Sequence, residues 1–308
     1  MKTIVLKVDV DTYRGTREGV PRLLEVFEDF GISATFLFSL GPDHTGWALR
    51  RIFRPGFFKK VQRTSVMKHY GLKTLLYGVL LPAPDIGRTC APLLRKVHEA
   101  GHEVGIHAYD HVYWQDHVSQ KGGDWTEQQL NLAFERFREI FGFEAKTHGA
   151  AGWQMNPHAL RWMERFPYAS DCRGESPFYP IQEGKSLSCL QLPTTLPTMD
   201  ELLGLDGVHE SNVAQRLLKW TEQEKPYGHV FTLHAELEGN LLAPAFFEFL
   251  KGLKAQGYEF LTMEKYFARV RTIVERMGEK GRFAVVDNEI SGRSGLVACQ
   301  ATAARTTS

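Results

Sequence analysis

The sequence lacks most features of secreted, membrane-spanning or nucleic-acid-binding proteins. Its four cysteines are scattered and form no CxxC pair, so we expect reduced thiols rather than a disulfide framework. No run of about 18 apolar residues occurs, which predicts no transmembrane helix. The first residues form a strand-like run without the basic segment and apolar core of a signal peptide, so we expect none. The net charge of +1 over 308 residues argues against a nucleic-acid partner.

Acidic residues are missing altogether from one segment, 44–84, although it carries eight lysines and arginines. Apolar and aromatic side chains are interleaved with these charges, and Pro55-Gly56 would interrupt any single helix. We therefore predict an insertion of two short amphipathic pieces that faces an anionic membrane. A basic insert that is merely solvated, or that packs on the acidic remainder, is the alternative. The expected membrane contacts are Arg50, Arg51, Phe53, Arg54, Phe57, Phe58, Lys59 and Lys60.

Elsewhere, strand-like apolar runs alternate with helical patterns, which predicts a parallel sheet that is open or closed into a barrel. The chain is read as one catalytic domain, 1–300, that carries the insertion 44–84. The tail from about Gly292 onwards is expected to fray, including 301–308. Expected strands are 3–9, 34–40, 103–107, 145–151, 167–171, 188–193, 229–235 and 258–262. Expected helices are 17–30, 88–100, 126–141, 157–166, 211–224, 243–256 and 263–277.

Polar residues gather where these strands end. In a β/α barrel the carboxyl ends of the strands share one rim, so residues far apart in the sequence would meet there. This placement is the strongest sign of an active site in the sequence. The residues concerned are Asp9, Asp11, His107, Gly149–Trp153, Asp171 and His234.

Two strand ends suggest a metal site. Asp9 and Asp11 are two residues apart and would point to the same side of a strand, where two like charges are costly without a cation. His107 and His111 have a helix-compatible spacing that is common among ordinary histidines. Taken together with the aspartates, they favour a divalent ion held by Asp11, His107 and His111. Zn²⁺ suits these ligands best, with Mn²⁺, Co²⁺ or Ni²⁺ as alternatives.

Three further residues can supply acid–base chemistry. Asp9, beside the metal, can accept the proton of a water nucleophile, although it could instead be a second ligand or cap a loop. His234 ends an apolar strand and can protonate a leaving amine, unless it is a hydrogen-bonded core histidine. Asp171 can orient His234, or it can be a turn residue. Arg14 and Arg17 follow the aspartates and suit a phosphate, or else lie in a solvated loop.

These motifs resemble those of the NodB-type polysaccharide deacetylases, carbohydrate esterase family 4. The resemblance lies in Asp9-x-Asp11, in Gly101–His111 with His107 and His111, and in Leu233-His234. It implies a distorted β/α barrel that removes N-acyl groups from sugars with a divalent metal. It also implies that Asp9 is the base, that Asp11, His107 and His111 bind metal, and that His234 is the acid.

The chain departs from that pattern in its first and third motifs. Val8-Asp9-Val10-Asp11 replaces Phe-Asp-Asp-Gly, and Ala150–Gln154 lacks the arginine that braces the base, for which Arg173 is the candidate substitute. In these motifs the sequence resembles instead one subgroup of the family, the deformylases that act in the modification of lipid A. The resemblance implies an undecaprenyl-phosphate-linked 4-deoxy-4-formamido-L-arabinose as substrate. Trp153 and Arg173 lie in its motifs and join Arg14 and Arg17 as candidate substrate residues.

Three hypotheses about function therefore remain. The first is metal-dependent deformylation of the lipid-linked aminosugar, at the cytoplasmic face of the inner membrane and with peripheral attachment. The second is deacetylation of a chitin- or peptidoglycan-like polysaccharide, which the basic insertion and the absence of a signal peptide disfavour. The third is a non-catalytic barrel that binds lipid-linked sugar, which the complete set of metal ligands, base and acid disfavours.

Overall fold

The structure of the protein is a computed structural model that describes residues 2–48, 71, 73–293 and 295–301. All eight residues expected to contact a membrane fall between 49 and 70, outside the described residues. The same holds for residues 302–308 of the expected frayed tail. In the described part of the chain, no helix combines the length and apolarity that crossing a bilayer requires.

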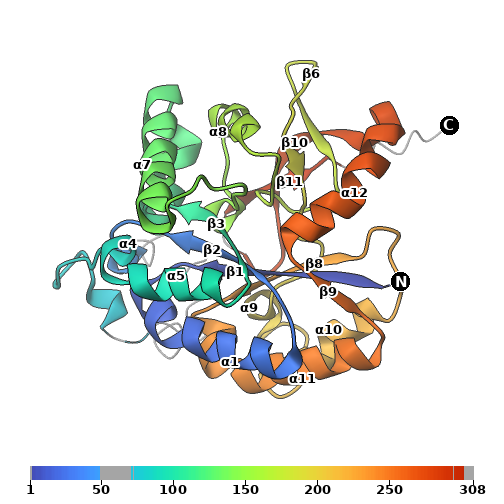
Figure 1. Cartoon of the computed structure of the whole chain (residues 1–308), viewed down its shortest axis with the longest axis horizontal. Helices are drawn as coiled ribbons and strands as arrows, with labels where there is room; N and C mark the ends of the chain where they lie inside the picture. Colours follow the sequence, from blue (N-terminus) through green and yellow to red (C-terminus); the bar gives the residue numbers. More distant parts are fainter. Residues whose placement is uncertain (1, 49–70, 72, 294, 302–308) are drawn as a thin grey trace.

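Four long parallel strands form one half of a barrel wall (Figure 1). Their order is β3 (Glu103–Ala108), β2 (Thr35–Ser39), β1 (Thr3–Val10) and β8 (His229–His234). The short strand β9 (Glu259–Leu261) pairs with the first residues of β1. Every residue of β1, β2 and β8 is buried, as expected for strands covered on both faces. The apolar runs in the sequence predicted all five.

The wall continues beyond β3 through a segment that is barely a strand. The expected strand 145–151 is reduced to a bridge between His148 and Ile106 of β3. The carbonyl oxygen of His148 then accepts a hydrogen bond from the N–H of Ser170 at 2.8 Å. The segment therefore lies beside β3, as a strand would, but it does not form the regular strand that was predicted.

Two very short strands bring the wall back to β8. Strand β4 (Tyr168–Ala169) pairs in parallel with β7 (Leu190–Gln191). Thr195 N–H donates to the carbonyl oxygen of Val230 in β8 at 3.0 Å, which closes the ring of segments. The result is the expected α/β fold, a distorted β/α barrel with one regular and one irregular half.

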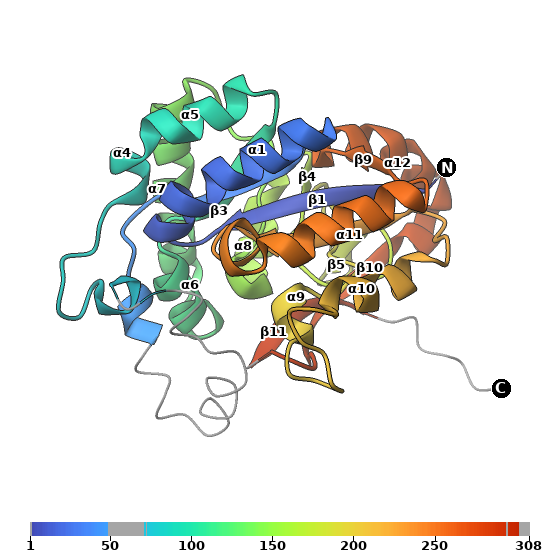
Figure 2. The same ribbon diagram turned by 90° about the horizontal axis from the view of Figure 1, so that it is seen from below.

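Helices cover the outside of the barrel, and α1 and α11 run along the same side of β1 (Figure 2). Gly31 and Gly142 cap α1 and α7 in the left-handed conformation, with φ of 61° and 77°, as their positions after helical runs predicted. In the described part of the chain the helices are α1 (Val20–Phe30), α4 (Ile86–Thr89), α5 (Ala91–Glu99), α6 (His111–His117), α7 (Gly123–Phe141), α8 (Pro157–Trp162), α9 (Met199–Leu202), α10 (Val213–Thr221), α11 (Ala243–Ala255) and α12 (Met263–Met277). Shorter helical turns include η1 (Gly15–Gly19), η3 (Thr74–Leu76), η5 (Ala151–Trp153) and η7 (Leu237–Leu241).

The end of the chain corrects the expectation of a tail that frays from about Gly292. Residues Leu296–Gln300 form β11, which pairs with β10 (Arg282–Glu289) in an antiparallel hairpin. Val297 and Ala298 are 2% and 1% exposed, because β11 packs against the barrel. β10 also pairs with β5 (Tyr179–Gln182), which pairs with β6 (Lys185–Ser186). The apolar run at 296–299 was the signal for this strand.

Candidate active site

The inner face of β1 carries three charged side chains in succession. Lys7, Asp9 and Asp11 are all buried, with exposed fractions of 0%, 2% and 7%. They alternate with Val8 and Val10, which belong to the apolar core, because successive side chains of a strand point to opposite faces. Lys7 therefore shares a face with Asp9 and Asp11, although the sequence interpretation named only the two aspartates.

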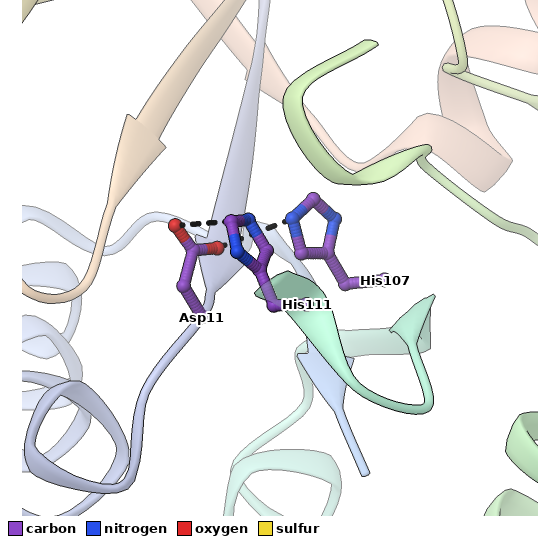
Figure 3. Close-up of side chains that lie close together, drawn as sticks. All are labelled: Asp11, His107 and His111. Carbon is purple, nitrogen blue, oxygen red and sulfur yellow. Dashed lines mark ion pairs between the residues drawn. The ribbon is translucent and has the colours of Figure 1, made fainter. Parts of the chain in front are cut away.

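The three expected metal ligands meet at this strand end (Figure 3). Asp11 follows β1, His107 lies near the end of β3, and His111 begins α6. The Nε2 atom of His107 lies 3.1 Å from Asp11 Oδ1, and Nε2 of His111 lies 3.4 Å from Asp11 Oδ2. One ligand atom from each residue falls within 4.8 Å of the others, so the geometry suits a single small ion.

The hydrogen bonds of these groups and the ionised state of Asp11 also suit a divalent cation. His107 Nδ1 lies 2.7 Å from the carbonyl oxygen of Gly149 and donates to it, which leaves Nε2 as the ligand atom facing Asp11. Burial opposes ionisation of Asp11, but His111 and His107 outweigh it and lower the pKa of the carboxyl. Asp11 Oδ1 is buried with no hydrogen-bond donor among the described residues. Two imidazoles and a carboxylate are a ligand set for Zn²⁺ or another first-row divalent ion.

His111 is placed by a helix start that the sequence interpretation missed. Asp110 caps α6, because its Oδ1 accepts the backbone N–H of Tyr113 at 3.0 Å. An aspartate three residues before the N–H that it accepts is an ordinary N-cap. The signal was present in the sequence, and it fixes His111 at the first residue of the helix.

Asp9 forms an ion pair with Lys7, whose Nζ lies 3.1 Å from Asp9 Oδ2. The other carboxylate oxygen, Oδ1, lies 3.8 Å from His107 Nδ1. A Cβ atom at position 149 would come within 2.8 Å of Lys7 Cε, so glycine there leaves room for the lysine. Lys7 therefore occupies the place beside the base for which Arg173 was the sequence-based candidate.

Arg173 lies elsewhere, which corrects that expectation. Its Nη1 pairs with Glu201 Oε1 at 2.6 Å, and its Nη2 donates to the carbonyl oxygen of Leu196 at 3.0 Å. Its guanidinium lies 4.9 Å from the ring of Trp153, which is 1% exposed. Arg173 and Trp153 are thus buried and engaged with protein groups, which favours a supporting role over direct substrate contact.

His234 ends β8 directly opposite Asp9 in the strand register. Its Nδ1 lies 3.9 Å from Asp200 Oδ1, too long for a hydrogen bond but near enough for electrostatic attraction. Its backbone N–H donates to Glu238 Oε2 at 2.7 Å, and burial raises the pKa of Glu238 to about 8. Asp200, in α9, is a neighbour of this candidate acid that no sequence motif revealed.

Asp171 does not orient His234, and that part of the prediction was wrong. Its Oδ1 accepts from His148 Nδ1 at 2.6 Å, and its Oδ2 accepts from Gln191 Nε2 at 3.0 Å. His148 and Gln191 both belong to the irregular half of the wall. Asp171 thus joins the short segments that close the barrel.

Glu236 is a further buried residue at the site that the sequence interpretation did not assign. Its Oε1 accepts from Asp11 N–H at 2.9 Å, from Thr12 N–H at 2.6 Å and from the Thr12 hydroxyl at 2.8 Å. A Cβ at Gly15 would lie 2.0 Å from that same oxygen, which requires glycine there. Burial raises the pKa of Glu236 well above its usual value. The residue ties the end of β8 to the loop that holds Asp11.

Arg14 and Arg17 lie at the next turn of the chain, beside and within η1. Arg14 Nε pairs with Glu18 at 2.8 Å, and both side chains are partly exposed. Arg17 Nη1 lies 3.3 Å from the hydroxyl oxygen of Tyr13, and its guanidinium lies over that ring. Their role in binding phosphate stays a prediction.

Comparison with known proteins gives close sequence relatives. A protein of Shewanella sediminis is 40% identical over 261 residues, 84% of this chain and 83% of the relative. A protein of Wigglesworthia glossinidia brevipalpis is 30% identical over 290 residues, 93% of this chain and 98% of the relative. Each is named a probable 4-deoxy-4-formamido-L-arabinose-phosphoundecaprenol deformylase, ArnD. A scan of protein-family models gave no match.

Solved structures share the fold at low sequence identity. A protein from Mycobacterium smegmatis assigned as a polysaccharide deacetylase superposes with a TM-score of 0.60 at 17% identity, covering 88% of this chain and 91% of that one. A family 4 acetyl xylan esterase from Clostridium thermocellum gives a TM-score of 0.51 at 13% identity, covering 89% and 92%. These similarities confirm the NodB-like architecture that the sequence motifs implied.

Proposed function

The chain belongs to the family of 4-deoxy-4-formamido-L-arabinose-phosphoundecaprenol deformylases, and on this premise we propose how its own residues act on that lipid-linked sugar. It is a hydrolase that cleaves a linear amide bond. The products are formate and an aminosugar that stays attached to its lipid. The free amine is cationic near neutral pH, which suits the modification of lipid A in resistance to cationic antibiotics.

One observation carries the proposed mechanism: a candidate base and a candidate acid lie at the same strand ends as a candidate metal-ligand triad. Asp9 and His234 are register partners on adjacent strands, and Asp11 is two residues beyond Asp9. Asp11, His107 and His111 would hold one divalent ion, with Zn²⁺ the best match to the ligands. A bound divalent ion supplies positive charge that acidifies a water and polarises the formyl carbonyl.

The protein groups account for the movement of protons. Asp9 takes a proton from the attacking water as the water oxygen bonds to the formyl carbon. Lys7 holds the Asp9 carboxylate in place from the side away from solvent, since its Nζ is 3.1 Å away and its side chain is fully buried. His234 then gives a proton to the nitrogen as the carbon–nitrogen bond breaks, and the carboxylate of Asp200 lies 3.9 Å from its Nδ1.

The substrate's lipid would remain in the bilayer, so the enzyme would meet its sugar at the cytoplasmic face of the inner membrane. Arg14 and Arg17 would bind the phosphate that joins sugar and lipid. The basic and aromatic residues between 49 and 70 would hold the enzyme peripherally on anionic lipid, at about 1 kcal/mol for each lysine or arginine near the surface. Vesicle co-sedimentation at low and high salt tests this attachment.

The proposed activity is tested on purified enzyme loaded with Zn²⁺, Co²⁺ or Mn²⁺. Mass spectrometry of the undecaprenyl-phosphate-linked formamido-sugar should show loss of one formyl group. Elemental analysis should show that His107→Ala and His111→Ala lose the ion while keeping the fold. Full metal occupancy in both variants would overturn the ligand assignment. Turnover of acetylated chitin oligosaccharides in place of the formamido-sugar would favour the polysaccharide deacetylase hypothesis.

A further inference from the structure

Both ends of the insertion are joined to each other in the described part of the chain. Residues 42–48 and 73–85 form a structure that we call the stem. An isolated antiparallel bridge closes its base. Further out, Trp47 Nε1 donates to the carbonyl oxygen of Gly78 at 2.8 Å. The stem is therefore a folded unit rather than a pair of independent loops.

One residue of the stem binds the loop that carries Asp11. Asp43 Oδ2 accepts the backbone N–H of Tyr13, two residues beyond that ligand, at 2.8 Å. Its other oxygen, Oδ1, accepts the N–H and the hydroxyl of Thr45 at 2.9 and 2.6 Å. Asp43 is 2% exposed, and each of its two oxygens has donors. The carboxylate thus links the stem to the end of β1.

The next residue binds the other metal-bearing segment. His44 Nδ1 pairs with Asp110 Oδ2, while Oδ1 of the same aspartate caps α6. Asp110 directly precedes the ligand His111. The His44 ring is stacked on Trp47, with ring centroids 3.7 Å apart and planes 8° from parallel. Trp47 therefore holds the His44 imidazole in position by stacking, and the imidazole in turn holds Asp110 at the start of α6.

We infer that Asp43 and His44 are positioning residues of the metal centre. Two consecutive residues fix the loop after β1 and the start of α6, and so set the separation of Asp11 from His111. Neither residue belongs to the metal-ligand motifs, and neither is a metal ligand. The inference rests on the proposed metal centre and adds to it that the stem of the insertion helps to build that centre.

The test measures metal affinity rather than activity alone. His44→Phe keeps an aromatic ring against Trp47 and removes the nitrogen that pairs with Asp110. Groups that orient ligands typically change metal affinity by about 10–100-fold, so we expect a rise of that size in the Co²⁺ dissociation constant. Asp43→Asn should show a smaller rise, because an amide offers one acceptor oxygen where the carboxylate offers two. Both are measured by chelator competition on the full-length protein.

Two controls separate positioning from general loss of stability. Asp85→Asn removes the negative charge that pairs with Arg136 Nη1 at 2.7 Å in the same stem, while the amide oxygen can still cap α4 by accepting the N–H of Arg88. It should lower the melting temperature and leave the Co²⁺ dissociation constant unchanged. His44→Gln can still donate to Asp110 and should recover most of the affinity. With saturating Co²⁺, His44→Phe should lose kcat more than it raises KM.

The outcomes distinguish this inference from the proposed function. Wild-type affinity in His44→Phe, or an equal loss in Asp85→Asn, would overturn the positioning role. A wild-type protein that binds no divalent ion at all would overturn the metal centre itself. Normal metal affinity in wild type together with failure to deformylate would leave the positioning role supported and remove the proposed mechanism.

Discussion

The two halves of the barrel wall are built in different ways. The regular half, β3-β2-β1-β8, is a ladder of long parallel strands with apolar residues on its outer side. In the irregular half, built from segments between 145 and 195, the wall strands β4 and β7 have two residues each, and buried polar side chains span the gaps. Among these, Asp171 pairs with His148 and Gln191, and Arg173 pairs with Glu201. Backbone pairing holds one half, and side-chain pairing contributes much of what holds the other.

The candidate catalytic residues and many of the groups that position them lie in different halves of the wall. The candidate base, acid and metal ligands all lie at the ends of strands in the regular half or directly beyond them. The irregular half supplies groups that hold them in place, such as the Gly149 carbonyl that accepts from His107 at 2.7 Å. A change at a strand end of the regular half should therefore cost rate, and a change in the irregular half should cost stability.

The largest expected effect is on rate, at Asp9 and His234. Asp9→Asn cannot accept a proton and His234→Ala cannot donate one, so each should lower kcat by roughly 10²–10⁴. Metal content should stay near that of the wild-type protein in both variants, whereas Asp9→Asn should also lower the melting temperature because it leaves Lys7 buried without its ion-pair partner. Single-turnover assays at saturating metal, with inductively coupled plasma analysis of the same samples, check this. Near wild-type kcat in either variant contradicts the assigned roles.

The next effect is on stability, at Asp171 in the irregular half. Asp171→Ala leaves His148 and Gln191 buried without their shared partner, and breaking a buried pair in this way typically costs about 3–5 kcal/mol. Urea unfolding should show this loss in the free energy of unfolding, and the metal affinity of the folded fraction should be retained. Asp171→Asn keeps an acceptor for His148 and should lose less. A stable Asp171→Ala variant with a specific rate defect would instead give Asp171 a catalytic role.

The regular half could be predicted from the sequence because its strands are continuous apolar runs that end in chemically distinctive residues. Asp9, Asp11, His107 and His234 were expected at strand ends on this ground, and the structure places them at or directly beyond the ends of β1, β3 and β8. Lys7 was missed although it lies two residues before Asp9 on the same face, which strand periodicity alone would have shown. Lys7 belongs to none of the motifs that drew attention to the aspartates and histidines, so its position on that face was not considered.

The irregular half could not be predicted at the same level. A strand of two residues leaves no periodicity, and the partners of Asp171 lie 20 and 23 residues away along the chain. Asp200 reaches His234 from a short helix, α9, that no strand–helix pattern indicated. Such contacts depend on how irregular loops pack, which local sequence does not encode. The hairpin β10–β11 differs, because the apolar residues of β11 were visible and were read as part of a tail, whereas β10 was not predicted.

A third prediction concerns pH and Glu238, which accepts the backbone N–H of the candidate acid His234. Burial raises its pKa to about 8 from a usual value of 4.5, so the folded protein holds a proton that the unfolded chain has released. Its contribution to stability is complete below about pH 4.5 and is lost as pH rises through about 8. Between pH 5 and 7 the loss should be about 2–3 kcal/mol. Glu238→Gln should lack this loss in urea unfolding, since Glu236 is present in both proteins. Parallel pH profiles contradict the shift.

Gly149→Ala tests how tightly the two halves fit. The added methyl group would meet Leu37 Cδ1 at 2.4 Å and Lys7 Cε at 2.8 Å. Overpacking of this kind costs about 1–3 kcal/mol. Because Lys7 must move, the variant should also lose kcat, which an ordinary packing change would spare. Thermal unfolding and steady-state kinetics on one preparation decide between the two. Unchanged kcat would show that the position of Lys7 does not matter to the base.

The smallest expected effect is at Gly31, in the regular half and remote from chemistry. Gly31 caps α1 with a φ of 61°, and a Cβ there would have no atom within 4 Å. Gly31→Ala should thus lose only the conformational preference of glycine, about 1 kcal/mol. Metal affinity and kcat should not change, in contrast to Gly149→Ala, where the same methyl group meets a charged neighbour. Chemical denaturation and Co²⁺ titration of both alanine variants make the comparison. A rate defect in Gly31→Ala equal to that of Gly149→Ala would mean that the two halves transmit small strains alike.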